Sequence, residues 1–280
     1  MKRALAITAV AAAVFAGFWL IPSRPRLTHM DFVVGGPDAL EFCDAASPRF
    51  LPVVARSSPV TASLSGSAPY ASGREAELTL VLRTNTGKAI HPGDLLLTGG
   101  QKVKLFAIDP SLTDFRALEL QPGKDGAWQV RFTPRFGGAY RFFADFTPVA
   151  TGREMYVATD LAVQGPVAAA AEGAVLSVER GGLRYHLSSA PAPLRIRESA
   201  WLTLGIAGPE GRAMATDQKD GRGSELVAFD SGRTGMVDLR LDAGGRSPVS
   251  FADSGSYAIW ADVRVEGQER RVPFSVRVEP

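Results

Sequence analysis

A run of short β-type segments occurs twice in this chain in the same order, and this repetition constrains the fold most. REAELTL (residues 74–80) returns as RESAWLTL (197–204), KLFAID (104–109) as ELVAFD (225–230), and FGGAYRFFADF (136–146) as SGSYAIWADV (254–263). A fourth pair is MYVATDLAV (155–163) and RVPFSVRV (271–278). The first three pairs are offset by 123, 121 and 117 residues, so the order holds while loops change length. An internal duplication of this kind predicts two structural units of one type.

Each copy consists of segments in which apolar and polar residues alternate, as in residues 76–84, 102–109 and 127–134. This period is typical of half-buried β-strands, and turn sequences such as NTGK and PGKDG lie between the segments. Short strands at such spacing indicate an antiparallel sandwich. We therefore predict an all-β protein with two tandem Ig-like antiparallel β-sandwiches. They cover residues 60–165 and 175–280, with a linker at 166–174.

The N-terminus carries an export signal, since Lys2 and Arg3 precede the eighteen uncharged residues 4–21. As a helix this run would rise about 27 Å, close to the roughly 30 Å hydrocarbon core. Residues 1–26 are then either an uncleaved signal anchor or a cleaved signal peptide. The membrane anchor residues would be Phe15, Phe18, Trp19 and Leu20. The first alternative predicts a single-pass protein of the bacterial cytoplasmic (inner) membrane with its bulk in the periplasm, and the second a protein secreted to the periplasm.

The net charge and the single cysteine limit the partners and cross-links that are expected. The formal net charge is only +2, and the arginines are scattered among acidic residues, so a nucleic-acid-binding face is not expected. The chain has one cysteine, Cys43, which excludes an intrachain disulfide. Cys43 is then a small buried hydrophobe, an intermolecular partner or a lone soft ligand.

The sequence contains none of the local motifs that mark common catalytic or nucleotide sites, such as GxSxG, HExxH, a P-loop or GxGxxG. Its three histidines, His29, His91 and His186, lie in separate segments. Asp145 and Asp262 end the repeated motif, and we interpret them as acceptors of loop hydrogen bonds. We predict that the protein is not an enzyme and has no catalytic residues, no cofactor and no evident small-molecule substrate.

A glycine turn precedes Tyr140 in the first copy and Tyr257 in the second. Each turn delivers the tyrosine into a strand whose alternate residues fill a core. The hydroxyl can then tie down a neighbouring loop, as in a tyrosine corner. We interpret the repeated motif as scaffold.

The order KLFAIDPSLTDFRALEL…GAWQVRFTPRFGGAYRFFADFTP, and its counterpart SELVAFDSGRTGMVDLRL…SGSYAIWADVRV, resemble the YtkA-like family of exported Ig-like domains. The resemblance implies metal-ligating histidines near one strand and after the next turn. Lys104 and Glu225 stand at the first position, and residues 117–119 and 238–240 at the second. A lysine ammonium and an arginine guanidinium have no free lone pair for a metal, so we predict no metal site.

Residues 27–59 belong to neither copy, and they are too apolar for an ordinary tether. They either add an edge strand to the first sandwich or pack on a partner through Phe42, Phe50, Leu51 and Val53. We predict a non-catalytic, membrane-anchored periplasmic accessory or structural subunit that docks on a membrane protein complex, an electron-transfer complex being one candidate. The alternative is a periplasmic metal (copper) handling or chaperone protein of the YtkA-like type.

Overall fold

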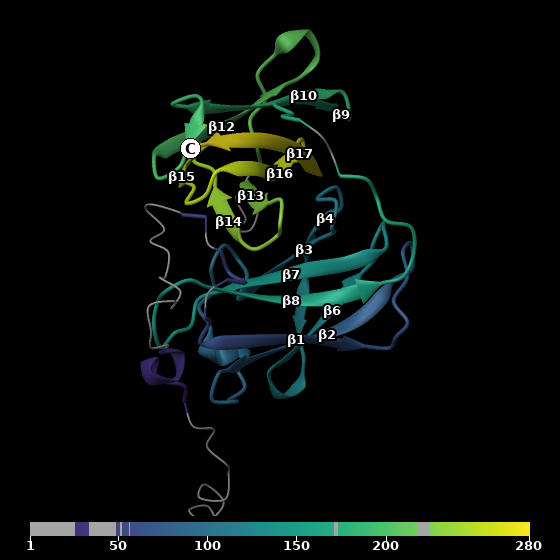
Figure 1. Cartoon of the computed structure of the whole chain (residues 1–280), viewed down its shortest axis with the longest axis vertical. Coiled ribbons are helices and arrows are strands. Elements are labelled where there is room, and N and C mark those ends of the chain that lie inside the picture. Colours follow the sequence, from purple (N-terminus) through teal and green to yellow (C-terminus); the bar gives the residue numbers. More distant parts are fainter. Residues whose placement is uncertain (1–25, 34–48, 51, 56, 171–172, 218–223) are drawn as a thin grey trace, which may run out of the picture.

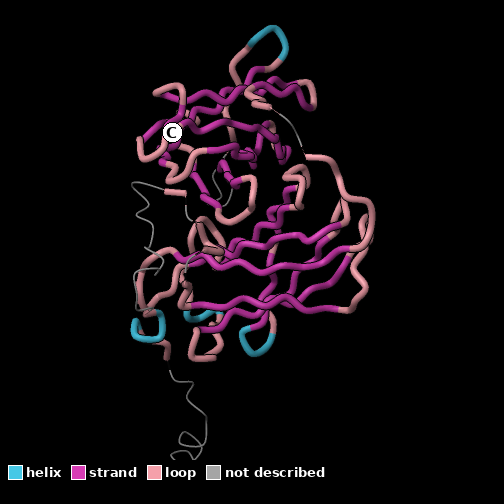
Figure 2. The backbone as a smooth tube through the Cα atoms, viewed as in Figure 1, coloured by secondary structure: helices cyan, strands magenta, loops and turns pink. Residues whose placement is uncertain are grey.

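Strands form nearly all the regular structure of this chain. The structure is a computed structural model that describes residues 26–33, 49–50, 52–55, 57–170, 173–217 and 224–280. Figure 1 shows two layered β units, the first in blue and teal and the second in green and yellow. Within the described residues the helical elements are short 3-10 turns (Figure 2), namely η1 (His29–Phe32), η2 (Pro92–Asp94), η3 (Lys124–Gly126) and η4 (Pro209–Gly211). The predicted all-β fold with Ig-like sandwiches is confirmed.

The first sandwich consists of two four-stranded sheets, ordered β1-β2-β6-β5 and β4-β3-β7-β8. Its strands are β1 (Val60–Gly66), β2 (Ala76–Thr84), β3 (Val103–Ile108), β4 (Phe115–Leu118), β5 (Leu120–Pro122), β6 (Ala127–Phe132), β7 (Gly138–Phe146) and β8 (Met155–Val163). All neighbouring pairs are antiparallel. In chain order these sheets have the A-B-E-D and C′-C-F-G arrangement of immunoglobulin-like domains.

The second sandwich repeats most of this plan, with strands added at its edges and, among the described residues, without a counterpart of β5. Its sheets are ordered β15-β12-β10-β9 and β11-β17-β16-β13-β14. Its strands are β9 (Ser177–Arg180), β10 (Leu183–Ala190), β11 (Leu194–Arg195), β12 (Ser199–Ala207), β13 (Glu225–Asp230), β14 (Met236–Arg240), β15 (Arg246–Ser250), β16 (Gly255–Val265) and β17 (Gln268–Glu279). The strands of the two units fall at 60–163 and 177–279, inside the ranges predicted from the repeat.

The two copies also build the same turn between matched strands. Asp109 directly follows β3, and its Oδ1 accepts from the backbone N–H of Asp114 at 2.8 Å. Asp230 holds the corresponding turn, where its Oδ1 accepts from Gly235 N–H at 2.8 Å. A threonine lies in each turn at the same offset, and Thr234 donates to Asp230. A carboxylate that caps its own following turn is a local sequence property, which explains why both copies retain the shape.

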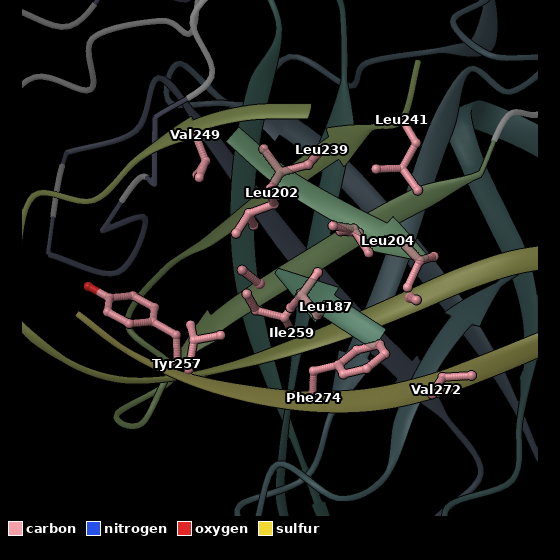
Figure 3. Close-up of a cluster of buried hydrophobic side chains, with 14 of the residues drawn as sticks. Leu187, Leu202, Leu204, Leu239, Leu241, Val249, Tyr257, Ile259, Val272 and Phe274 are labelled. Atoms are coloured by element: carbon pink, nitrogen blue, oxygen red, sulfur yellow. The ribbon is translucent and has the colours of Figure 1, made fainter. Parts of the chain in front are cut away.

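Each sandwich encloses its own apolar core, filled by every second residue of its strands. Tyr140 and Phe142 of β7 point into the first core, and Tyr257 and Ile259 of β16 point into the second. Figure 3 shows part of the second core, in which Leu202 and Leu204 of β12 lie opposite side chains from β16 and β17. The alternating direction of side chains along each strand therefore explains which residues fill both cores.

Residues 1–25, which include the predicted anchor residues Phe15, Phe18, Trp19 and Leu20, lie outside the described residues. In the part of the chain that the structure describes, no helix has the length and apolar character needed to cross a membrane.

Candidate functional site

The two sandwiches pack against each other through equivalent sheets, and their contact forms a third apolar core. The first sandwich contributes outward-facing residues of the sheet β4-β3-β7-β8, and the second those of the sheet containing β13, β14 and β16. The fully shared core consists of Val53, Phe106, Ile108, Phe115, Phe143, Tyr156, Val227, Phe229, Met236 and Trp260. These strands are therefore buried on both faces.

Aromatic residues from equivalent sheets of the two copies meet across this contact. Phe143 of β7 packs on Phe229 with ring centroids 5.7 Å apart, and Phe115 stacks on Trp260 at 5.5 Å. The Trp260 indole N–H also donates to the carbonyl of Leu112 in the first sandwich at 3.2 Å. The same face of each copy thus forms the contact, as in an isologous dimer whose subunits have been joined in one chain.

A buried charge cluster lies at one side of this apolar core. The Lys104 ammonium donates to Glu225 Oε2 at 2.5 Å and also to Asp238 Oδ2. The three side chains are only 10%, 15% and 3% exposed, respectively. Arg271 pairs with Asp262 at 3.1 Å on the neighbouring strand. The ion pairs of Lys104 join the first sandwich to the second, so they fix how the two units meet.

One ammonium faces more carboxylates than it can neutralise, and this imbalance governs the pKa values of the cluster. Burial raises the pKa of Glu225 to about 8, with Asp238 adding to the shift and Lys104 opposing it. Burial raises the pKa of Asp145 well above its usual range, with Glu154 adding to the shift. Burial alone would lower the pKa of Lys104, but the charges of Asp238 and Glu225 outweigh it and raise that pKa. Lys104 therefore stays charged.

A polar cleft of about 490 Å³ opens beside the cluster, between the two sandwiches. Its walls carry charged and amide groups from both units, among them Gln101, Lys104, Glu119, Arg240, Asp262 and Arg271. Lys104 and Asp262 are engaged in ion pairs, and Arg271 also donates to the carbonyl of Ala117 across the contact at 3.3 Å. The arrangement holds two domains together by charge and hydrogen bonding.

The positions at which the family resemblance implies metal ligands converge on this cluster. Lys104, Glu225 and Asp238 form its centre, and Ala117 accepts the hydrogen bond from Arg271. Among the described residues, no group of three or more histidine, cysteine, aspartate or glutamate side chains has an arrangement that could hold a metal ion. The convergence itself could not be read from the sequence, because residues about 120 apart meet only when the sandwiches pack.

The three histidines lie on different elements of the fold. His29 begins the turn η1, His91 precedes η2, and His186 lies on β10, where its Nδ1 is 2.9 Å from the Ser177 hydroxyl. Cys43 lies outside the described residues.

The interpretation of the repeated tyrosines as loop ties is confirmed. Tyr140 Oη donates to Asp114 at 2.6 Å and accepts from the backbone N–H of Phe136 at 3.1 Å. Tyr257 Oη donates to the carbonyl of Asp253 at 2.8 Å. The interpretation of Asp145 and Asp262 as acceptors of loop hydrogen bonds needs correction. Both are drawn into the charge cluster between the sandwiches, where Asp262 pairs with Arg271.

The prediction that residues 27–59 present partner-binding anchors is wrong for two of the four candidates. Phe50 is buried in the core of the second sandwich, where its ring lies 5.0 Å from that of Tyr257. Val53 is buried in the core between the sandwiches. Their burial inside this chain removes both side chains from a partner's reach. Phe42 and Leu51 lie outside the described residues.

For the alternative prediction, an edge strand on the first sandwich, the described residues of 27–59 show other contacts. Phe32 of η1 is buried in the first core, whereas Arg49 forms a parallel bridge to Ser250 at the edge of the second sandwich. Val54 then donates to the carbonyl of Thr234 at 2.8 Å before β1 enters the first sandwich. The described parts of this segment thus contact both units, and we call residues 49–50 and 52–55 the strap.

Comparisons with known proteins return folds of a general kind. No family model matches the chain, and no curated protein matches it. Among solved structures, a Lin-41 filamin domain is 21% identical, with 37% of this chain and 91% of that chain covered and a TM-score of 0.23. Fibronectin(III)-like modules of Clostridium thermocellum CbhA are 13% identical, with 78% and 93% covered and a TM-score of 0.22. A DUF4785 family protein from Legionella pneumophila is 11% identical, with 79% and 56% covered and a TM-score of 0.29.

Proposed function

We propose that this protein is a non-catalytic accessory subunit, anchored in the bacterial cytoplasmic membrane through residues 4–21, that docks on a membrane protein complex at the periplasmic face. The packing of the two sandwiches supports a structural role. Their equivalent sheets bury each other, and the charged groups of the cleft are used to join them. A unit of this kind offers its remaining outer faces to partners.

The observation that carries the docking proposal is an exposed tryptophan on one such outer face. Trp201 lies on β12, in the sheet of the second sandwich that does not pack on the first, and is 47% exposed. The Arg246 guanidinium lies 5.5 Å from its ring centroid, and Pro248 is its neighbour on β15. Tryptophan and arginine are the residue types most enriched among binding hot spots. A sheet face with an exposed indole on an inner strand is suited to a protein contact.

The docking proposal is tested by comparing Trp201→Ala with Arg184→Ala, a control on the adjacent strand β10. We expect Trp201→Ala to weaken recovery of the native complex in mild detergent by at least tenfold, corresponding to about 1.4 kcal/mol or more. The Arg184→Ala variant should give the same recovery of the native complex as the parent protein. Both variants should keep the parent melting temperature. Recovery of the complex by Trp201→Ala at the level of the parent protein would contradict docking through Trp201.

The anchoring proposal has its own test. Full-length protein should remain in the membrane fraction after a carbonate or high-salt wash, because neither treatment extracts an apolar helix by screening charge. A soluble protein whose N-terminal residue is Gly17 or later would show that residues 4–21 act as a cleaved signal instead.

A further inference from the structure

One end of the first sandwich carries several large apolar side chains that no other part of the described chain covers. The bridge between Ala71 and Gln164 places the start of β2 and the end of β8 together at the opposite end. The apolar end is therefore the one at which the end of β2, the start of β3 and the loop between β7 and β8 meet. The turn η1 joins them, because Asp31 pairs with Lys88 at 2.5 Å, just after β2. In Figure 1 this turn is the purple element beside the first sandwich.

The apolar residues at this end form what we call the end patch. Their side chains are between 41% and 69% exposed, and they are Met30, Val33, Leu96, Leu97 and Val149. Backbone bonds hold the two loops together, since Leu96 N–H donates to Thr147 and Val149 N–H donates to Asp94, both at 2.8 Å. The Lys102 ammonium donates to the carbonyls of Pro92 and Leu95. The patch is thus displayed on loops that are tied in place.

The end patch includes part of η1, which follows the predicted membrane anchor closely in the sequence. The apolar run of the sequence ends at Ile21, and Leu27, which packs against the first core, lies only six residues later. Six extended residues span at most about 22 Å. Phe32 is buried in the first core and Asp31 is paired with Lys88, so the chain is fixed to this end of the sandwich directly after that short tether. A helix spanning the bilayer at residues 4–21 would hold the end patch against the membrane surface.

We propose that the end patch rests in the lipid interface of the membrane that holds the anchor, with Leu96 and Leu97 entering the boundary between headgroups and acyl chains. The proposal rests on the proposed anchoring by residues 4–21. Clustered exposed aliphatic side chains mark contact surfaces, and the bilayer is the surface that this short tether keeps within reach of the end patch. The contact fixes the tilt of both sandwiches relative to the membrane and so the direction in which Trp201 faces.

The test uses full-length protein with Cys43→Ser, reconstituted in lipid nanodiscs of phosphatidylethanolamine and phosphatidylglycerol. An environment-sensitive fluorophore is attached at Leu97→Cys. The control label is at Val167→Cys, an exposed apolar position in the linker at the opposite end of the first sandwich. We expect a blue-shifted emission at position 97 and at least a twofold loss of its intensity with lipids brominated near the glycerol ester. The label at position 167 should show neither change.

The experiment distinguishes an error in the anchoring proposal from an error in the lipid-contact proposal. Protein that does not associate with nanodiscs at all would refute the proposed anchoring. Protein that associates while position 97 stays as water-exposed as position 167 would overturn the lipid contact alone. A label that is aqueous in nanodiscs but shielded in native membranes would show that a protein covers the end patch, which also overturns the proposal.

Discussion

Tyr140 and Tyr257 occupy matched positions in the two copies but hold different partners. Tyr140 donates to the buried carboxylate of Asp114, whereas Tyr257 donates to a backbone carbonyl at a more open turn. Removing a donor from a buried carboxylate costs more than removing one from a carbonyl that water can reach. The duplication therefore provides its own internal comparison.

We expect Tyr140→Phe to lower the free energy of unfolding by about 1–3 kcal/mol, and Tyr257→Phe by about 1 kcal/mol or less. Urea denaturation followed by tryptophan fluorescence measures both. A larger loss for Tyr257→Phe than for Tyr140→Phe would contradict the view that the hydrogen bond to Asp114 contributes more to stability.

Lys104 is the central cation of the contact between the sandwiches. Lys104→Met leaves Asp238 buried without its counter-ion and Glu225 without its hydrogen-bond donor, so we expect a loss of about 3–5 kcal/mol in the free energy of unfolding. The triple variant Lys104→Met, Glu225→Leu, Asp238→Leu removes all three polar groups and should regain most of that stability. A loss below about 1 kcal/mol for the single variant would mean that water reaches the cluster.

The same cluster makes stability depend on pH. Glu225 has a pKa of about 8 in the folded protein against 4.5 in the unfolded chain, so the folded state holds a proton that the unfolded chain releases. The contribution of Glu225 to stability is therefore fully present below about pH 4.5 and is lost as the pH rises to about 8. The groups that set this behaviour are Lys104, Asp145, Asp238 and Asp262.

Urea midpoints at pH 5 and pH 8 test this dependence. We expect a lower midpoint at pH 8 in the parent protein and a smaller difference in Glu225→Gln, which cannot titrate. Parent midpoints that are equal at both values, or higher at pH 8, would contradict the raised pKa of Glu225.

Individual strands could be predicted from the sequence because apolar and polar residues alternate along each of them and a turn sequence follows each one. The contact between the sandwiches was not predicted, although a signal for it exists. In β3, Phe106 and Ile108 lie on the face opposite Leu105, and in β13 Val227 and Phe229 lie opposite Leu226. Apolar residues on both faces indicate a strand that is buried on both sides of its sheet. The sequence does not show what covers the second face, because apolar residues are expected there whether the cover is the other sandwich or a partner protein.

The strap illustrates the same ambiguity for an irregular segment. Its apolar content indicated burial, but burial alone does not distinguish this chain from another. The contacts of Phe50 with Phe251 and Tyr257 resolve the question for that side chain, because they lie inside the second sandwich.

We expect Phe50→Ala to lower the free energy of unfolding by about 3–5 kcal/mol, the usual cost of truncating a buried aromatic residue. Val54→Ala is the matched control, since Val54 lies in the same strap but is half exposed, and it should cost less than about 1 kcal/mol. Thermal melts of both variants measure the difference. Unchanged melting of Phe50→Ala with lost recovery of a partner would restore the docking role of this residue.

At the scale of the whole molecule, the two duplicated sandwiches form one packed unit. Three features support this, namely the shared apolar core, the buried ion pairs of Lys104 and the strap that contacts both sandwiches. Domains joined by a linker alone move relative to each other unless their interface is large and apolar. A fixed arrangement is also what the docking and lipid-contact proposals require, because each assigns a direction to a face.

Pulsed electron paramagnetic resonance tests the packed unit most directly. Spin labels at Glu77→Cys on β2 and Ser188→Cys on β10 place one exposed probe on each sandwich, with Cys43→Ser removing the native thiol. We expect a single narrow distance distribution, which broadens when Lys104→Met and Phe143→Asp are introduced. A broad distribution in the parent protein, unchanged by those substitutions, would show that the sandwiches move independently and would contradict the packed unit.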